Sequence, residues 1–477
     1  MTMRTRGLSA ALGVLLACVE RMAIARPGGG GSYHGGGGGG GGGGVHIPTG
    51  GGFGGGVTPH AYGAGGSVAG SPNLVSFLVL VGVMTTLVIA VVVLGSVMRA
   101  RARRLGVQAA SDWRGAFDAL RARDPALTEA SLDGHVRSMA DILRKAWCGG
   151  DMRPARPFVS DGVYSRFQVQ LALMALENRR NVMSDTRVLS TAIVAVEDAA
   201  PLEVVHVCVT AEARDIEVPC NADEAEVRRR LRLAKVAPYT EIWSLVRRMG
   251  ALSKPTGFAV GLACPACGAP LAGGEIIRCA YCGGLVCSGE HDWVLAEITQ
   301  EVEWRPTAPA APGFDALRTR DPGVAREVIE DRASYVFWKW VQAARQRNTA
   351  PLHRCATSRW LAAGAGLGGA QAACDVAVGG AELVGCGVGP DGFEFADVKV
   401  YWSTQFVGAR TYSSLQAIVR LIRRLGVQST PSMTALVCQA CSAPLSASDS
   451  PVCEHCGAAL ADGAQAWVLD GIGAVGE

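Results

Sequence analysis

The stretch FDALRARDP at residues 117–125 recurs as FDALRTRDP at residues 314–322. Further along the chain three more segments recur in the same order: LVRRMG as LIRRLG, CPACGAPL as CQACSAPL, and WVL as WVL, beginning at residues 245 and 421, 264 and 438, and 293 and 467. The spacing between partners shrinks along the chain. This pattern predicts a tandem duplication with deletions in the second copy.

The first copy places helical patterning before strand patterning. Apolar residues recur at helical spacing between Val136 and Trp147, and a second amphipathic helix is expected at 164–178. Segments rich in β-branched residues predict strands at 188–196, 202–218 and 239–248, with a turn at 198–201 and a charged helix or excursion at 223–235. Helices followed by strands predict an α+β domain in which a curved antiparallel sheet wraps on helices.

The second copy keeps these signals, except that its long helix is weakened. The counterpart of residues 167–176 is residues 360–371, and this segment contains Gly364, Gly366, Gly368 and Gly369. Each glycine costs a helix about 1 kcal/mol relative to alanine. We therefore expect a looser second copy that serves the first as a structural partner.

Eight of the sixteen cysteines form two sets with the spacing C-x2-C-x11-C-x2-C. Two such pairs complete a tetrahedral shell of four sulfurs, the arrangement that favours Zn²⁺ and leaves no open position for catalysis. Glycine after a pair permits the tight turn that the knuckle needs. The sequence predicts two structural zinc ribbons, with these ligands: Cys264, Cys267, Cys279 and Cys282 in the first, and Cys438, Cys441, Cys453 and Cys456 in the second.

Other uses of the cysteines are weaker interpretations. Stable disulfides are rare in the cytoplasm, and paired knuckles exceed what a redox C-x-x-C motif requires. Cys287, with His291, could replace a ligand of the first ribbon, although a bystander role is simpler. Some ribbons bind nucleic acid, and Arg247 and Arg248 lie just upstream, but no interleaved aromatic residues or wider basic stripe accompany them. The remaining cysteines lack metal spacing and are expected to be small buried residues: Cys148, Cys208, Cys220, Cys355, Cys374 and Cys386.

The first hundred residues predict membrane anchorage. Residues 1–25 have the charged start, short apolar core and small-residue site of a signal peptide, with lipidation of Cys18 or an uncleaved anchor as alternatives. Residues 26–73 are mostly glycine and are expected to be disordered. Residues 74–98 are apolar, uncharged and long enough to span a bilayer. The positive-inside rule then places all that follows in the cytoplasm, because four arginines flank the span: Arg99, Arg101, Arg103 and Arg104.

Several short motifs resemble the Tim-forty-four-like domain family, which is named for the subunit that tethers the import motor to the mitochondrial inner membrane. They are Ala146 and Trp147, Asp151, RPFVSDGVYSRF at 156–167, Asn181 and Val182, ARD at 213–215 and TEIWSLVR at 240–247. A signal peptide, glycine-rich arm, single span and terminal ribbon are also similar to bacterial members. The resemblance covers residues 110–300 well and residues 314–477 weakly. The order of the motifs along the chain is stronger evidence for it than any one motif.

The resemblance implies a cone related to nuclear transport factors, with a deep apolar pocket between sheet and helices, and a tethering role at the inner membrane of a bacterium. The mitochondrial motor itself cannot be carried over, and the built-in span replaces peripheral attachment. The expected segments are a signal peptide (1–25), arm (26–73), span (74–98), first α+β domain (108–258), first ribbon (259–300), linker (301–313), degenerate second copy (314–432) and second ribbon (433–477).

These observations favour a membrane-anchored scaffold over an enzyme. The expected ligand is a lipid tail or a hydrophobic protein segment, held by Phe158, Tyr164, Phe167, Leu171 and Trp243, unless these residues only form the core. Expected partners are membrane lipids and a membrane or cytoplasmic protein, and the net charge of +3 points to no acidic partner. The alternatives are an adaptor that faces the ribosome or nucleic acid through its ribbons, and a pocket enzyme using Asp185, His206, Asp215 or Glu241.

Overall fold

The computed structural model describes residues 113–253, 263–271, 276–301, 304, 311–409, 411–430, 432–435, 437–445 and 450–474. The expected signal peptide, glycine-rich arm, membrane span and flanking arginines lie outside the described residues. Within these described ranges, no helix combines the length and the apolar character needed to cross a membrane.

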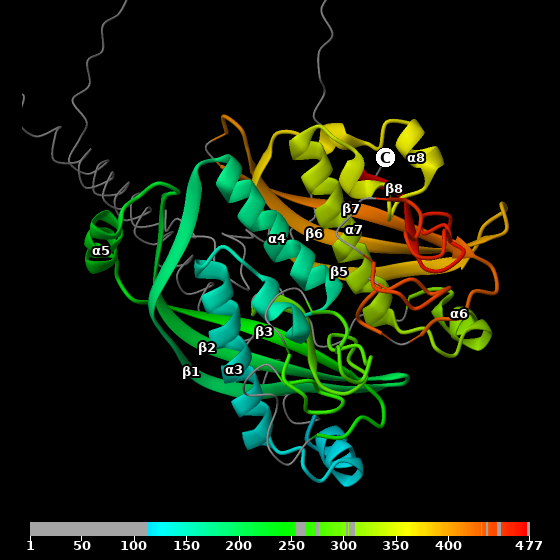
Figure 1. The fold of residues 1–477 in the computed structure, drawn as a ribbon, viewed down its shortest axis with the longest axis horizontal. Coiled ribbons are helices and arrows are strands. Elements are labelled where there is room, and N and C mark those ends of the chain that lie inside the picture. Colours follow the sequence, from blue (N-terminus) through cyan, green and yellow to red (C-terminus); the bar gives the residue numbers. More distant parts are fainter. Residues whose placement is uncertain are drawn as a thin grey trace, which may run out of the picture. The chain divides into compact units, whose positions relative to one another are not determined.

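The first copy is an α+β unit, as the residue pattern predicts. A helical segment at 113–123 precedes α3 (Glu129–Cys148), the 3₁₀ turn η1 (Arg153–Phe158) and α4 (Asp161–Leu176). These helices are followed by β1 (Arg179–Ala199), β2 (Leu202–Pro219), α5 (Glu224–Leu233), β3 (Ala237–Arg248) and β4 (Val294–Gln300). The strands form one antiparallel sheet in the order β1-β2-β3-β4, and α3 packs against β1, which it crosses in Figure 1.

The fourth strand differs from the expected domain division. The expected first ribbon covers residues 259–300, whereas Val294–Gln300 pairs with β3, from Glu241 opposite Gln300 to Val246 opposite Val294. The first ribbon is therefore an insertion between two neighbouring strands of the sheet. The repeated WVL motif marks the return of the chain from the ribbon into the sheet, a role that its three residues could not reveal.

The second copy repeats this architecture with a shorter helix. It contains α6 (Phe314–Arg320), α7 (Arg326–Gln346), η2 (Ala350–Leu352), α8 (Ser358–Ala362), η3 (Leu367–Gly369), β5 (Ala373–Val388), β6 (Phe393–Phe406), β7 (Tyr412–Arg424) and β8 (Val468–Ala474). Its sheet has the order β5-β6-β7-β8, with β8 again following a ribbon. The expected weakening of the long helix is confirmed, because α8 has 5 residues where α4 has 16.

Helix α4 compensates for the short α8. Val163 and Phe167 pack in the core of the first copy, whereas Val169 and Leu173, on another face of the same helix, pack in the core of the second copy. The expected amphipathic helix at 164–178 is thus corrected: α4 begins at Asp161 and is buried on opposite sides. A helix that is buried on more than one face lies between two layers of the structure. One helix therefore serves two cores.

The repeated motifs converge on one buried ion cluster in each copy. In the first, Arg247 donates to Asp124 and Glu203, both at 2.7 Å, and its guanidinium lies 4.4 Å from the centre of the Trp293 ring. In the second, Arg423 donates to Asp321 and Glu394, also at 2.7 Å, over Trp467 at 4.5 Å. The FDALR-x-RDP, RR and WVL motifs supply the aspartate, arginine and tryptophan of each cluster. The repeats thus tie the first helical segment, β3 or β7, and the end of each ribbon together.

The two copies contact each other through α4 and α7. The Ser160 hydroxyl caps α4 by accepting from the Val163 amide at 3.2 Å and donates to the Asp331 carboxylate at 2.5 Å. The Gly162 amide also donates to Asp331, at 3.1 Å. A Cβ at residue 162 would lie 2.4 Å from that carboxylate, so glycine is required for this close approach. The copies thus form one folded body rather than separate modules.

Candidate metal centres and the cavity beside them

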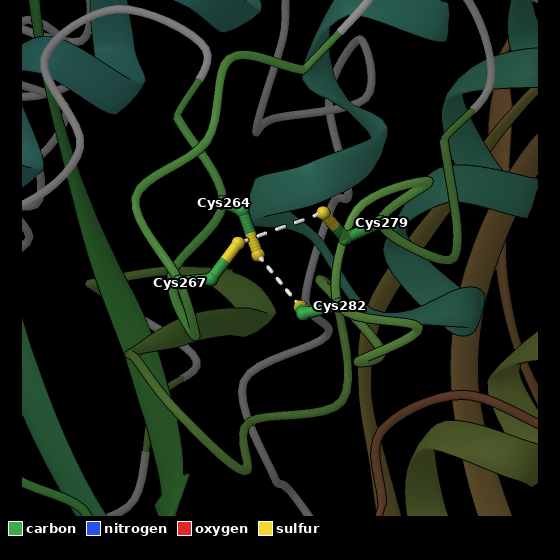
Figure 2. A group of neighbouring side chains, drawn as sticks. All are labelled: Cys264, Cys267, Cys279 and Cys282. Carbon is green, nitrogen blue, oxygen red and sulfur yellow. Dashed lines mark hydrogen bonds between the residues drawn. The ribbon is translucent and has the colours of Figure 1, made fainter.

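Four cysteine side chains converge in the first ribbon. Figure 2 shows Cys264 and Cys267 on one loop facing Cys279 and Cys282 on another. The Sγ atoms of Cys264 and Cys282 are 3.7 Å apart, and those of Cys267 and Cys279 are 3.8 Å apart. All four sulfurs lie within 4.8 Å of one another, so the expected group is confirmed as one that could bind a metal ion.

The sulfur spacing fits a tetrahedral shell. A zinc–sulfur bond of about 2.3 Å places the sulfurs of a regular tetrahedron about 3.8 Å apart. A disulfide instead needs sulfurs at about 2.0 Å. The spacing of 3.7–3.8 Å therefore matches metal ligation and does not match a bridge between any printed pair.

Each knuckle is closed by a residue with positive φ after its second cysteine. Gly268 and Gly283 have φ of 78° and 70°, and their amides donate to the carbonyls of Cys264 and Cys279 at 2.8 and 2.9 Å. This confirms the expected role of glycine in the turn. The amides of Cys282 and Tyr281 also hold the pKa of Cys279 at about 7, below its ordinary value. A thiol with a lowered pKa gives up its proton to a metal readily.

The second ribbon repeats this geometry. The Sγ separations are 3.7 Å between Cys438 and Cys456 and 3.8 Å between Cys441 and Cys453. Gly457 adopts φ of 73° after the second knuckle of this ribbon, while Ser442, at 58°, follows the first, where the other three knuckles have glycine. Both groups alternate buried and exposed cysteines, so each metal site would lie at the edge of its ribbon.

Cys287 and His291 are not members of the first group, which consists of four cysteines. Cys287 is fully buried beside Ile277 and Val437, so it packs where the first ribbon meets the segment leading into the second. His291 lies 3.9 Å from Glu290. Neither residue is needed to complete the four-sulfur shell, in agreement with the bystander interpretation.

The five residues expected to line an apolar pocket gather around one core. Phe158, Phe167 and Trp243 are buried in the first copy's hydrophobic cluster, and Leu171 is half-buried against it. Tyr164 is 7% exposed and lies both in this cluster and on the wall of a cavity outside it. A pocket enclosed by all five stays a prediction, and Tyr164 is the residue that leads from the core to an open space.

That space is a cavity of about 630 Å³ bounded by both copies and both ribbons. Its volume is in the range typical of small-molecule sites. Helices α4 and α7 form two walls, and Ile276–Arg278 and Pro444–Leu445 bring the two ribbons to it. No sequence pattern predicted this cavity, because its walls come from five segments that meet only in the folded chain: α4, Ile276–Arg278, α7, Arg354 and Pro444–Leu445.

The candidate catalytic residues do not gather in one place. Asp215 and His206 lie nine residues apart on β2, so they are about 30 Å apart and on opposite faces. The His206 ring contacts Ser244 Oγ at 2.9 Å and Glu197 at 3.2 Å. Asp185 is exposed and pairs with Arg214, while buried Glu241 accepts from Trp243 Nε1 at 3.1 Å. An enzyme interpretation needs Asp215 and His206 to converge in one pocket, and these two described residues do not do so.

Carboxyl groups cluster where α7 meets the first sheet, around a second cavity of about 80 Å³. Burial raises the pKa of Glu297 and Glu327, and raises that of Glu330 well above its ordinary value. Burial, reinforced by the charge of Asp161, raises the pKa of Asp331 to about 8. Arg326 offsets part of this negative charge, 2.9 Å from Glu197. We therefore expect the contact between the copies to depend on pH.

We expect Asp331→Asn to flatten the pH dependence of stability. The pKa of Asp331 rises from about 3.8 unfolded to about 8 folded, so its contribution is complete below pH 3.8 and is lost as pH rises towards 8. Asparagine stays neutral, and its oxygen can still accept from Ser160 and Gly162. Between pH 5 and pH 8, the free energy of unfolding of the variant should rise relative to that of the parent by more than about 1 kcal/mol, which is the equivalent of roughly one pKa unit.

Urea unfolding at both pH values measures this difference. Asp118→Asn, at an exposed position with a surface ion pair to Arg121, is the matched control and should change stability equally at pH 5 and pH 8. A constant difference between Asp331→Asn and its parent across this range would show that Asp331 does not titrate within it.

The arginines upstream of the first ribbon have separate roles. Arg247 is 1% exposed and occupied by its buried ion cluster, whereas Arg248 is exposed and pairs with Glu290 at 3.2 Å. Arg247 therefore offers no surface to nucleic acid.

Comparison of the whole chain with protein families, curated proteins and solved structures finds no match, so the residues themselves carry the functional argument.

Proposed function

We propose that this chain is a membrane-anchored scaffold that binds a lipid tail or a hydrophobic protein segment, with the metal of its ribbons, Zn²⁺, in a structural role. The observation that carries the proposal is the cavity of about 630 Å³ between α4, α7 and the ribbons. Its apolar wall contains Val169, Ile276 and Leu445, and Tyr164 connects it to the residues expected to contact the ligand. The membrane anchor is inferred from the apolar, uncharged residues 74–98 of the sequence.

Three further features support binding over catalysis. Each ribbon uses all four positions of a tetrahedral shell for cysteine, which leaves none for substrate. The candidate acid–base residues lie apart. The relationship to the Tim-forty-four-like family and to its cone-shaped fold is part of this proposal, and it rests on the motifs at 156–167 and 240–247.

Native mass spectrometry of the full-length chain, extracted in mild detergent, tests the proposal. The parent protein should carry an additional mass of lipid or peptide size. Gln342→Trp should lose that mass, because residue 342 lines the cavity and an indole there would fill it. Gln346→Trp makes the same change at an exposed position one turn later on α7 and should keep it. A folded parent protein without a bound mass, or equal retention in the two variants, would overturn the proposal.

A further inference from the structure

The cavity between α4, α7 and the ribbons has positive charge on several walls. Arg278 comes from the first ribbon, Lys339 from α7, and Arg354 from the segment after η2. Asp161 is the one carboxylate among the described residues that line the cavity. It is occupied by an ion pair with Arg156 and by the amide of Ala435 at 2.6 Å. The cavity therefore carries a net excess of cations.

The position of Arg278 is fixed by neutral groups. Its guanidinium donates to the carbonyl of Gly283 in its own ribbon and to that of Ser442 in the second ribbon, the latter at 2.9 Å. These carbonyls hold the side chain in place without neutralising its charge. A cation held this way is ready to bind an anion, because little side-chain entropy remains to be lost.

Buried polar atoms without partners line the same cavity. Ser165 is 4% exposed, and its hydroxyl has no hydrogen-bond partner within the described structure. Among the described residues, the side-chain oxygen of Gln342 is also buried without a hydrogen-bond partner. A buried polar group left unpaired is unfavourable, because it has lost its hydrogen bonds to water without gaining a partner. A ligand that accepts from the Ser165 hydroxyl would remove this cost.

We propose that this cavity binds a ligand through a phosphate group, held by Arg278, Lys339, Arg354 and the Ser165 hydroxyl. A phosphate offers several charged acceptor oxygens, and such hydrogen bonds are about twice as strong as neutral ones. Tyr164 and Tyr335 also line the cavity and provide amphipathic walls for the body of the ligand. This inference rests on the proposed function, since it names the chemistry of the ligand that the scaffold holds.

The phosphate could belong to a lipid headgroup or to a free organic phosphate, and two probes distinguish them. Calorimetry on the full-length chain in detergent would measure binding of glycerol 3-phosphate and of short-chain phosphatidylglycerol. A lipid source predicts much tighter binding of phosphatidylglycerol, and a soluble source predicts equal affinities. Lys339→Gln should weaken binding by about tenfold or more, as expected for one charged hydrogen bond. Lys235→Gln removes the same charge at an exposed position and should leave binding unchanged.

Two outcomes overturn the inference: absence of binding of either probe by the parent protein, or equal affinity of the Lys339→Gln and Lys235→Gln variants. The mass measurement separates this failure from failure of the scaffold. A bound mass that Gln342→Trp removes, and that Lys339→Gln leaves, preserves the scaffold and rejects the phosphate. A parent protein that carries no mass rejects the scaffold, whatever the affinity for phosphate.

Discussion

Replacing Arg247 by alanine is expected to lower the free energy of unfolding by about 3–5 kcal/mol, the cost of breaking a buried ion pair by removing one partner. Its side chain is 2% exposed and lies 2.7 Å from Asp124 and from Glu203, which are themselves buried. Burial raises the pKa of Asp124, but hydrogen bonds from Arg247 and Ser253 outweigh it and hold that pKa below its ordinary value. Without Arg247 both carboxylates would lose this buried counter-charge, although Glu203 would keep its ion pair with Arg123 at 3.0 Å.

Chemical unfolding of the full-length chain measures the effect, and Arg248→Ala provides the matched control. Arg248 is the next residue on β3, and its side chain is 48% exposed. A surface ion pair of this kind contributes about 0–1 kcal/mol. Equal losses in the two variants would show that the buried cluster has no special role in stability.

The second copy offers an independent repeat of this experiment. Arg423→Ala should destabilise strongly, and Arg424→Ala should not, because Arg423 is 1% exposed in the side chain and Arg424 is 57% exposed. If the repeated cluster is what holds each copy together, both pairs of variants give the same contrast. A strong loss in the first copy alone would show that the second copy does not depend on its cluster.

Replacing Cys282 by serine is expected to remove one of two zinc ions and to unfold the first ribbon. Structural zinc sites contribute apparent free energies of about 10–16 kcal/mol at pH 7, and this energy is also the folding energy of the site. The ribbon has few apolar contacts of its own: a small cluster around Leu271 and Val286, besides the two buried cysteines. Loss of a ligand should therefore leave it without enough burial to remain folded.

Elemental analysis of the purified chain measures this result directly, with two zinc ions per chain expected for the parent and one for Cys282→Ser. Limited proteolysis should cut the variant within residues 263–293 and spare the sheets. Cys220 is exposed, contrary to the expectation that it is buried, and lies outside both groups, so Cys220→Ser should keep both ions. Zinc content that stays at two in Cys282→Ser, or that is zero in the parent, would reject the four-cysteine shell as a zinc site.

Local patterns predicted the parts of this fold whose causes are local. The helical spacing between Val136 and Trp147 predicted α3, because a buried helical face needs apolar residues every three or four positions. Likewise, the expected strand at 202–218 is β2, at Leu202–Pro219. The two cysteine groups were predictable for the same reason, since a knuckle is built from neighbouring residues and the metal shell restricts which knuckles can pair.

The sequence by itself determined the duplication, the α+β class and the two four-cysteine groups, because each depends on order, period or spacing along the chain. Only the tertiary structure decided that α4 serves both cores, that Gly162 lies against Asp331, and that three repeated motifs meet at Arg247. It also decided the cavity that Arg278 and Lys339 share. Such contacts join residues far apart in sequence, and their energy depends on burial that no local pattern encodes.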